Sequence, residues 1–322
     1  MFLKAYGTEV KIDYNNADSL NAYPSELMKE FVQSTEEGLD IEKYRGLFEA
    51  VSALENGEHK TRLGNVLFDI VMAAPMKEGY KYNEPSNLEE IRALRKEHEF
   101  DAVMPDEKTL RKKLLGAWTG RACGCLLGKP VECIRSDELI PLLKETGNYP
   151  MHRYILSTDI TDEVCSKYKF GLKNKCYADT VDGMPVDDDT NYTVLAQLIV
   201  EDYGRNFRPE NVAFAWMKYQ PVFSYFTAER TAFVNFINCI MPPAAAMYKN
   251  VAREWIGAQI RGDYYGYINV GNPEAAAEMA FRDASISHVK NGIYGEISAL
   301  SVQGDILGEK YFNGDMGTSN VF

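Results

Sequence analysis

The stretch LGAWTGRACGCLLGKPVE, residues 115–132, decides how the rest of the chain is interpreted. Its glycines at 116, 120, 124 and 128 recur every four residues, so a helix would place them on one slowly turning face. Four glycines cost a helix roughly 3 to 4 kcal/mol relative to alanine. The usual compensation is close approach of another backbone or of a ligand. We therefore expect a helix over residues 107–128 that is either tightly packed or forms one wall of a ligand site.

The sequence on both sides of this helix predicts more helices and no strands of useful length. Apolar residues at helical spacing fill residues 24–74, and a short helix is expected near 87–98. Further helices are expected over 188–203, after Pro209, within 227–249 with a break at Pro242–Pro243, and from Asn272–Pro273 to about residue 290. The stretch 130–186 has weak periodicity and is expected to be irregular.

These patterns predict an all-α fold in three parts. A small helical N-terminal unit would cover residues 1–76, and a connector would cover 77–106. The main helical domain would cover residues 107–322 and begin with the glycine-rich helix.

Charge and composition exclude several classes of function. A net charge of −12 argues against general nucleic-acid binding, although it leaves room for one small anionic ligand beside a metal or a helix N-terminus. The N-terminus lacks the pattern of a signal peptide, and no apolar run approaches the length of a membrane span. Lysines and arginines in the glycine-rich stretch also disfavour a membrane helix dimer. We expect a cytoplasmic protein that contacts neither membrane nor nucleic acid.

The chain has six cysteines, three of them close together at positions 123, 125 and 133. Their spacing fits no common zinc pattern, and no histidine lies near them. We interpret the cysteines as structural thiols in a reducing compartment.

The strongest local sign of chemistry is the run Asp187–Asp188–Asp189–Thr190 at a predicted helix start. One aspartate is enough to cap a helix, and aspartates are also favoured in the first turn. Three adjacent carboxylates repel each other unless a positive charge lies among them. Oxygen donors suit a hard cation such as Mg²⁺. A capping run and a metal site both remain open here.

Three other segments carry candidate site residues. Glu132 follows the glycine-rich helix and is a candidate catalytic or metal-linked carboxylate, although a lone loop glutamate is commonly solvated. The segment GAQIRGD, residues 257–263, would cradle phosphate or ribose, or would be a turn with a surface arginine. His288 is a candidate base, although a single histidine at a helix end is more often a cap or a packed side chain.

Taken in order, these motifs resemble the ADP-ribosylglycohydrolases. The glycine-rich helix with its loop to Glu132 is similar to that family's opening helix, and Asp188–Asp189–Thr190 to the core of its Thr-Asp-Asp-Thr metal motif. Asp283–Ala284, His288, Gly292 and Gly295 resemble its later Asp-Ala…His…Gly…Gly segment. The resemblance spans most of residues 25–300. Within the family, the chain is similar to a bacterial subgroup that has an extra helical N-terminal unit. It implies an all-α fold, a binuclear centre of Mg²⁺ or Mn²⁺, and hydrolysis of a glycosidic bond to ADP-ribose in an ADP-ribosylated protein or a related compound.

The resemblance also assigns roles by position. Asp188 and Asp189 would be metal ligands. Asp187 stands where the family usually has threonine, and we expect it to offer a further carboxylate oxygen to the metal. Glu132 would be the base or a metal-linked group. The residues expected to line the ADP-ribose cleft are Gly257, Gln259, Arg261, Asp263 and His288. Arg121 stands where many members have aspartate.

The last part of the sequence leads to a different expectation. Family members carry a second aspartate-rich cluster on a late helix, whereas residues 303–322, QGDILGEKYFNGDMGTSNVF, show no helical period. Asp305 and Asp315 sit in no recognisable motif. We expect the family's C-terminal part to be missing from this chain, with little hydrolysis by the chain alone.

Two other functions remain open. A non-catalytic relative that binds ADP-ribose or a nucleotide would have an incomplete metal site. An all-α magnesium-dependent diphosphate lyase would need a further acidic residue one turn after the first pair. Asn191 and Tyr192 weaken that alternative.

Overall fold

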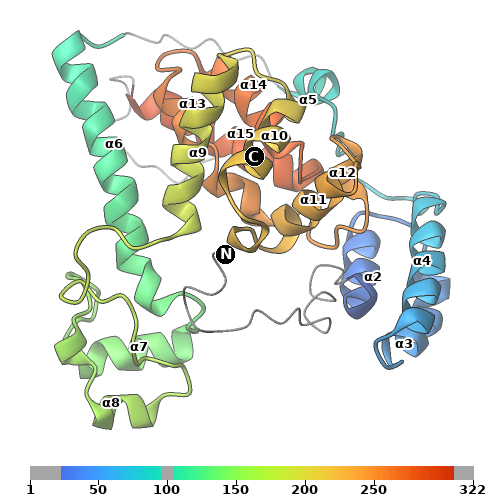
Figure 1. Ribbon diagram of the computed structural model, residues 1–322, viewed down its shortest axis with the longest axis horizontal. Helices are drawn as coiled ribbons and strands as arrows, with labels where there is room; N and C mark the ends of the chain where they lie inside the picture. The colour runs from blue at the N-terminus through green and yellow to red at the C-terminus, as the bar shows by residue number, and fades with distance from the viewer. Residues whose placement is uncertain (1–22, 96–103, 308–322) are drawn as a thin grey trace, which may run out of the picture.

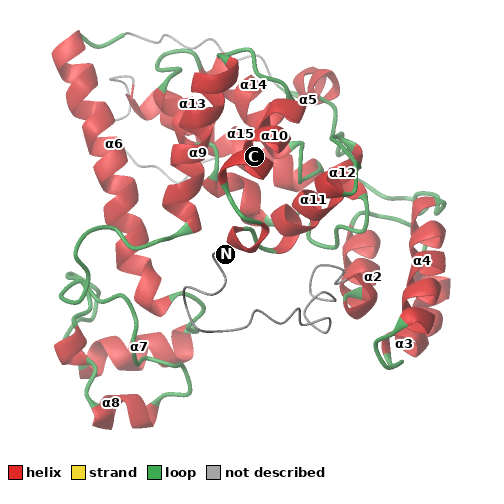
Figure 2. Ribbon diagram, in the orientation of Figure 1, coloured by secondary structure: helices red, strands yellow, loops and turns green. Residues whose placement is uncertain are grey.

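A computed structural model of the chain describes residues 23–95 and 104–307 (Figure 1). Within these ranges the secondary structure is helical and contains no strand, and an isolated antiparallel bridge joins Leu39 and Met76 (Figure 2). The predicted all-α fold is therefore confirmed. The α-helices are α2 (Leu27–Glu36), α3 (Arg45–Ser52), α4 (Glu58–Met72), α5 (Leu88–Leu94), α6 (Glu107–Gly128), α7 (Ser136–Glu145), α8 (Asp162–Lys167), α9 (Asp188–Tyr203), α10 (Pro209–Tyr219), α11 (Thr227–Ile237), α12 (Ala244–Met247), α13 (Asp263–Tyr267), α14 (Pro273–Ala284) and α15 (Lys290–Leu307).

Helices α2, α3 and α4 form a small unit with a core of its own, at the right of Figure 1. Leu27, Phe31 and Phe48 are almost fully buried in it. Gly38 follows the end of the first helix and adopts a φ of +86° that other residues rarely reach. No described helix is both long and apolar enough to cross a membrane.

A larger core lies among α9, α10, α11, α13, α14 and α15, in the centre of Figure 1. Its aromatic side chains pack directly: the rings of Trp216 and Tyr225 stack with centroids 4.5 Å apart. Tyr265 is fully buried against the ring of Phe207. This core is the rigid support for the start of α9, where the three aspartates lie.

Arg253 joins the N-terminal unit to the larger core through buried ion pairs. Its guanidinium donates to Glu37 at 2.5 Å and to Glu30 at 2.9 Å, both on or next to α2. Arg253 is 1% exposed and Glu30 is fully buried. Removing one partner from such a pair commonly costs more than the pair itself contributes, so these residues fix the N-terminal unit in place.

Two predicted helix ends were wrong. The helix that opens at Pro273 ends at Ala284, not near residue 290, because the chain turns inward and the amide of Val289 donates to the carbonyl oxygen of Arg253 at 2.9 Å. The next helix, α15, continues beyond Val302 to Leu307. An established helix extends at little cost, and one glycine at position 304 costs only about 1 kcal/mol. Residues 308–322 lie outside the described residues.

The stretch 130–186 is also more regular than predicted. It contains α7 and α8, which pack around a small core of Leu142, Val164 and Leu172. A proline inside α7, Pro141, and the shortness of α8 explain why the sequence shows so little helical period there.

The glycine-rich helix α6 forms one edge of the molecule, with α9 beside it (Figure 1). None of its side chains is buried, and Trp118 meets Tyr267 of α13 at a centroid distance of 5.7 Å. A Cβ atom built on any of the four glycines would meet no described heavy atom within 4 Å. Close packing by a described helix is therefore not the reason for the glycines, because α9 packs on the neighbouring face. A ligand at the open face stays a prediction.

Candidate functional site

The three aspartates at the start of α9 have different surroundings. Asp187 is the helix cap: its Oδ1 accepts a hydrogen bond from the amide of Asp189 at 3.0 Å. Its Oδ2 accepts a hydrogen bond from Lys129 Nζ at 2.7 Å, just after the end of α6. Burial raises the pKa of Asp187, but hydrogen bonds from Lys129 and Cys125 outweigh it and hold that pKa below its usual range. The capping interpretation thus accounts for one aspartate of the three.

Asp188 and Asp189 carry negative charge that the chain compensates less well. Burial raises the pKa of Asp188, and the charges of Asp187, Asp189 and Glu132 raise it further. Burial also raises the pKa of Asp189, against the opposing effect of the Arg121 guanidinium. A bound divalent cation would stabilise both carboxylates in their ionised form. Their oxygen atoms therefore fit the kind of cation that the resemblance implies.

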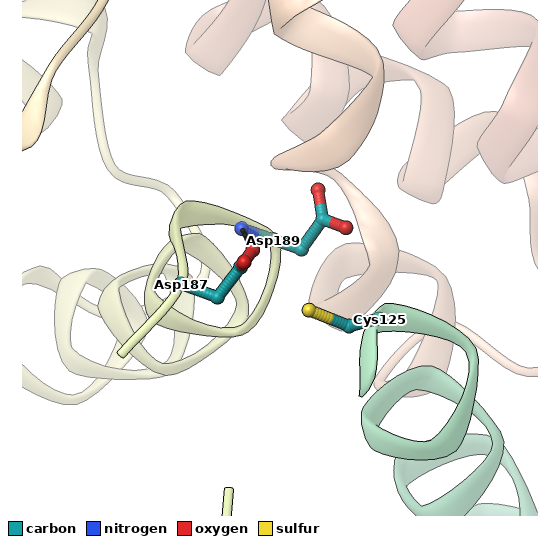
Figure 3. Close-up of side chains that lie close together, drawn as sticks. All are labelled: Cys125, Asp187 and Asp189. Atoms are coloured by element: carbon teal, nitrogen blue, oxygen red, sulfur yellow. Dashed lines mark hydrogen bonds between the residues drawn. The ribbon is translucent and has the colours of Figure 1, made fainter. Parts of the chain in front are cut away.

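A thiol lies among these oxygen donors. One ligand atom from each of Cys125, Asp187 and Asp189 can be chosen so that all lie within 4.8 Å of one another. Figure 3 shows Cys125, on α6, pointing toward the aspartates at the start of α9. Burial raises the pKa of the Cys125 thiol to about 12, and its hydrogen bond with Asp187 adds to the rise. Sulfur is a poor ligand for Mg²⁺, so the thiol does not fit that ion.

Arg121 connects α6 to both sides of the site. It donates to the main-chain carbonyl oxygen of Asp189 and to that of Ile260, the latter at 2.5 Å. It also forms an ion pair with the Asp263 carboxylate. At a position where the resemblance leads us to expect an aspartate, the chain has a fixed positive charge beside Asp189.

This arrangement was not predicted from the sequence, although one pattern indicates part of it. Arg121, Cys125 and Lys129 are spaced by four residues and therefore share one face of α6, next to the glycine face. Their partners are far along the chain: Lys129 and Asp187 are 58 residues apart. Spacing alone predicts the shared face but not what it contacts.

Glu132 lies on the exposed turn that follows α6, at the end of a 3-10 helix, η5 (Lys129–Val131). Its charge raises the pKa of Asp188, so its carboxylate is near enough to influence the aspartate cluster. The turn that holds Glu132 follows directly on Lys129, the partner of Asp187, and a catalytic role for Glu132 stays a prediction.

The predicted cleft segment, residues 257–263, is divided between surface and interior. It spans a 3-10 helix, η8 (Ile256–Ile260), and the start of α13. Gln259 is exposed and touches Gly295, while Asp263 is 5% exposed and pairs with Arg121. A side chain at Gly257 would collide with the carboxylate of Glu229. This glycine is needed for a close approach inside the protein.

Arg261 and His288 lie in the interior. Arg261 is 1% exposed, and its guanidinium donates to Asp283 at 2.5 Å and to Ser287 at 2.7 Å. His288 is also 1% exposed, and burial lowers its pKa well below the usual value, so its ring is neutral. Its Nδ1 lies 2.8 Å from the Ser287 hydroxyl. These contacts support the protein interior, and contact of either residue with substrate stays a prediction.

Comparison with known protein families identifies the larger part of the chain. A sequence profile described as ADP-ribosylglycohydrolase matches residues 106–309, more than half of the 322-residue chain. The match begins at Asp106, the cap of α6, and includes the aspartate cluster, the segment 257–263 and His288. Neither the curated proteins nor the solved structures gave a match. The chain belongs to the ADP-ribosylglycohydrolase family.

Proposed function

We propose that this protein is a divalent-cation-dependent hydrolase that cleaves a glycosidic bond to ADP-ribose. The substrate would be an ADP-ribosylated protein or a related ADP-ribosyl compound. Family membership supports hydrolase activity of this type. The main support for the proposal is the aspartate cluster at the junction of α6 and α9, where the pKa values of Asp188 and Asp189 are raised, with Glu132 on the turn that follows α6.

The aspartates at the start of α9 would hold the cation, with Mg²⁺ or Mn²⁺ implied by the resemblance. A bound divalent cation supplies polarisation of oxygen ligands and orientation of ribose and water. Side chains of the protein set the charge and the position of these aspartates. Lys129 holds Asp187 ionised, and Arg121 fixes the main chain of Asp189 by two hydrogen bonds. Because these contacts exist in the free protein, little rearrangement is required when substrate binds.

Glu132 would act as the base. As the oxygen of a water molecule bonds to the anomeric carbon of the ribose, Glu132 accepts a proton from that water. The bond from the anomeric carbon to the leaving group breaks, the leaving group takes up a proton from solvent, and Glu132 then releases to solvent the proton that it accepted. His288 is neutral and buried and would not exchange protons with solvent. Of the cleft residues expected from the sequence, exposed Gln259 is the one best placed to reach a ligand.

The test is release of free ADP-ribose from an ADP-ribosylated peptide, with and without millimolar Mg²⁺ or Mn²⁺. We expect release that requires the cation, stops with a chelator and falls in Glu132→Gln. Failure of both release and binding of ADP-ribose would contradict the proposal.

A non-catalytic ADP-ribose-binding protein is the second candidate. Arg121 and Lys129 favour it, because two fixed positive charges already lie beside Asp189 and Asp187 and would compete with a second metal ion. Binding of ADP-ribose without release from any substrate would select this alternative.

A further inference from the structure

We propose that the cation site at the start of α9 prefers a thiophilic divalent ion, such as Zn²⁺ or Co²⁺, over Mg²⁺, with Cys125 as a ligand. The inference concerns the site of the proposed function and rests on its metal-binding part. It does not depend on turnover, since a protein that only binds ADP-ribose would hold the same ion.

The ligand atoms lie close enough together to reach one ion. The ligand atoms of Cys125, Asp187 and Asp189 lie within 4.8 Å of one another and come from two different helices. Ligands on one tetrahedral zinc ion, with bonds of about 2.0 to 2.3 Å, lie roughly 3.5 Å apart. Closing the remaining gap therefore needs side-chain movements of about 1 Å, without a change in the position of either helix.

The donor atoms of the site are one sulfur and carboxylate oxygens. Mg²⁺ binds oxygen and retains its waters, so it would leave the sulfur of Cys125 unused. Thiolate together with carboxylate suits Zn²⁺ and its chemical relatives, which also bind most sites more tightly than lighter divalent ions do. A thiol beside the carboxylates of Asp187 and Asp189 therefore changes which ion the site selects.

The site also leaves room for water or substrate to reach a bound ion. Gly124 and Gly128 flank Cys125 on α6, and the space where their side chains would be is open among the described residues. Three protein ligands would leave one position for water or substrate, the arrangement typical of reactive zinc sites. Asp187 would keep its hydrogen bonds to Lys129 and to the Asp189 amide and bind through a remaining lone pair. The thiol loses its proton on binding, so each ion bound releases one proton to solvent and no electrons are exchanged.

The test is titration of the purified chain with Co²⁺ and observation of the sulfur-to-cobalt charge-transfer band. We expect the band in the wild-type chain, its loss on addition of Zn²⁺, and its persistence in millimolar Mg²⁺. Cys125→Ser should lose the band and bind Zn²⁺ at least about 100-fold more weakly, since even indirect supporting groups can change affinity by that factor. Cys123→Ser is the matched control: its thiol is exposed, two residues away on α6, and its loss should leave the band unchanged.

A second readout uses the wild-type chain and avoids any folding defect of a variant. Zn²⁺ should slow alkylation of Cys125 at least about tenfold, measured by peptide mass spectrometry, while Mg²⁺ should not. Absence of the band, its survival in Cys125→Ser, its displacement by Mg²⁺, or equal alkylation with and without Zn²⁺ would overturn the inference. Hydrolysis driven by Mg²⁺ without a sulfur band refutes this inference alone, whereas a sulfur band without hydrolysis refutes only the proposed reaction.

Discussion

The guanidinium of Arg121 donates two hydrogen bonds to the main-chain carbonyl oxygen of Asp189, at 2.9 Å from Nε and 2.7 Å from Nη2. This contact holds the middle of α6 against the first turn of α9. The same guanidinium pairs with Asp263, which is largely buried at the start of α13. One side chain therefore sets the relative position of three segments around the aspartate cluster.

Arg121→Ala should lower the free energy of unfolding by about 3 kcal/mol, because it removes the cationic partner of a largely buried carboxylate. Urea denaturation measures the change. The control is Arg111→Ala on the same helix, whose ion pair with Glu107 is about 80% exposed on both sides and should contribute less than about 0.5 kcal/mol. Equal effects of the two substitutions would show that Arg121 does not hold α6 in place.

Asp189→Asn should abolish stabilisation of the protein by divalent cations while preserving the fold. The substitution keeps the shape of the side chain and leaves the cap, Asp187, untouched. A ligand that binds only the native state must raise its melting temperature, so thermal melts with and without metal measure the effect. Asp182→Asn, an exposed aspartate in the preceding loop, should behave as the wild type. Metal-induced stabilisation that persists in Asp189→Asn would remove this residue from the metal site.

Glu132→Gln should reduce turnover roughly 100-fold or more with little change in ADP-ribose affinity, because it removes a base and keeps the shape of the side chain. Initial rates of ADP-ribose release and calorimetric binding give the two quantities. The control is Asp137→Asn, another exposed acid, in the first turn of α7. If Glu132→Gln turns over like the control, Glu132 is an ordinary solvated glutamate.

Stability should also depend on pH through Glu254, which accepts a hydrogen bond from Gln33 of α2 at 3.3 Å. Burial raises the pKa of Glu254 from 4.5 to about 7, and the charge of Glu37 adds to the rise. The folded chain therefore holds this proton more tightly than the unfolded chain. The contribution to stability is complete below pH 4.5 and is lost as the pH rises toward 7.

Glu254→Gln stays neutral at every pH and should remove this loss. Relative to the wild type, the variant should gain about 1 kcal/mol in free energy of unfolding between pH 5 and pH 8, after allowance for solvent screening of a partly exposed carboxyl. Any hydrogen bond that the amide fails to make adds an offset that does not vary with pH. Denaturation of both chains at several pH values measures the difference. Glu36→Gln, an exposed glutamate of α2, should show no such trend, and parallel curves for Glu254→Gln and wild type would disprove the assignment.

Local sequence predicts much of the fold, because helix boundaries depend on a few residues with distinctive conformations. The helix over residues 188–203 and the helix starts at Pro209 and Pro273 lie where the sequence predicts them. The end of α14 could not be predicted in this way. Nothing in Asp-Ala-Ser-Ile-Ser-His breaks a helix, and the turn depends on the carbonyl oxygen of Arg253, which is distant in the sequence.

The candidate site also has features that local sequence predicts and features that depend on distant residues. The run of aspartates is local, and its capping and repulsion follow from adjacency. Three side chains on or just after α6 contact residues at the start of α9, which are distant in the sequence: Arg121, Cys125 and Lys129. Such tertiary contacts do not follow from local sequence. The burial of Arg261 also depends on carboxylates from three separate helices, whereas its sequence neighbours suggest a surface turn.

We expect the junction of α6 and α9 to bind ADP-ribose in a cation-dependent way. Calorimetric titration of the wild-type chain and Asp189→Asn with ADP-ribose, each with and without a divalent cation, tests it most directly. Mg²⁺, Mn²⁺ and Zn²⁺ are compared in separate titrations. We expect the wild type to bind ADP-ribose only with at least one of these cations, and Asp189→Asn to lose this binding. Binding of equal strength without any cation, unchanged binding by the variant, or no binding under any condition would contradict it.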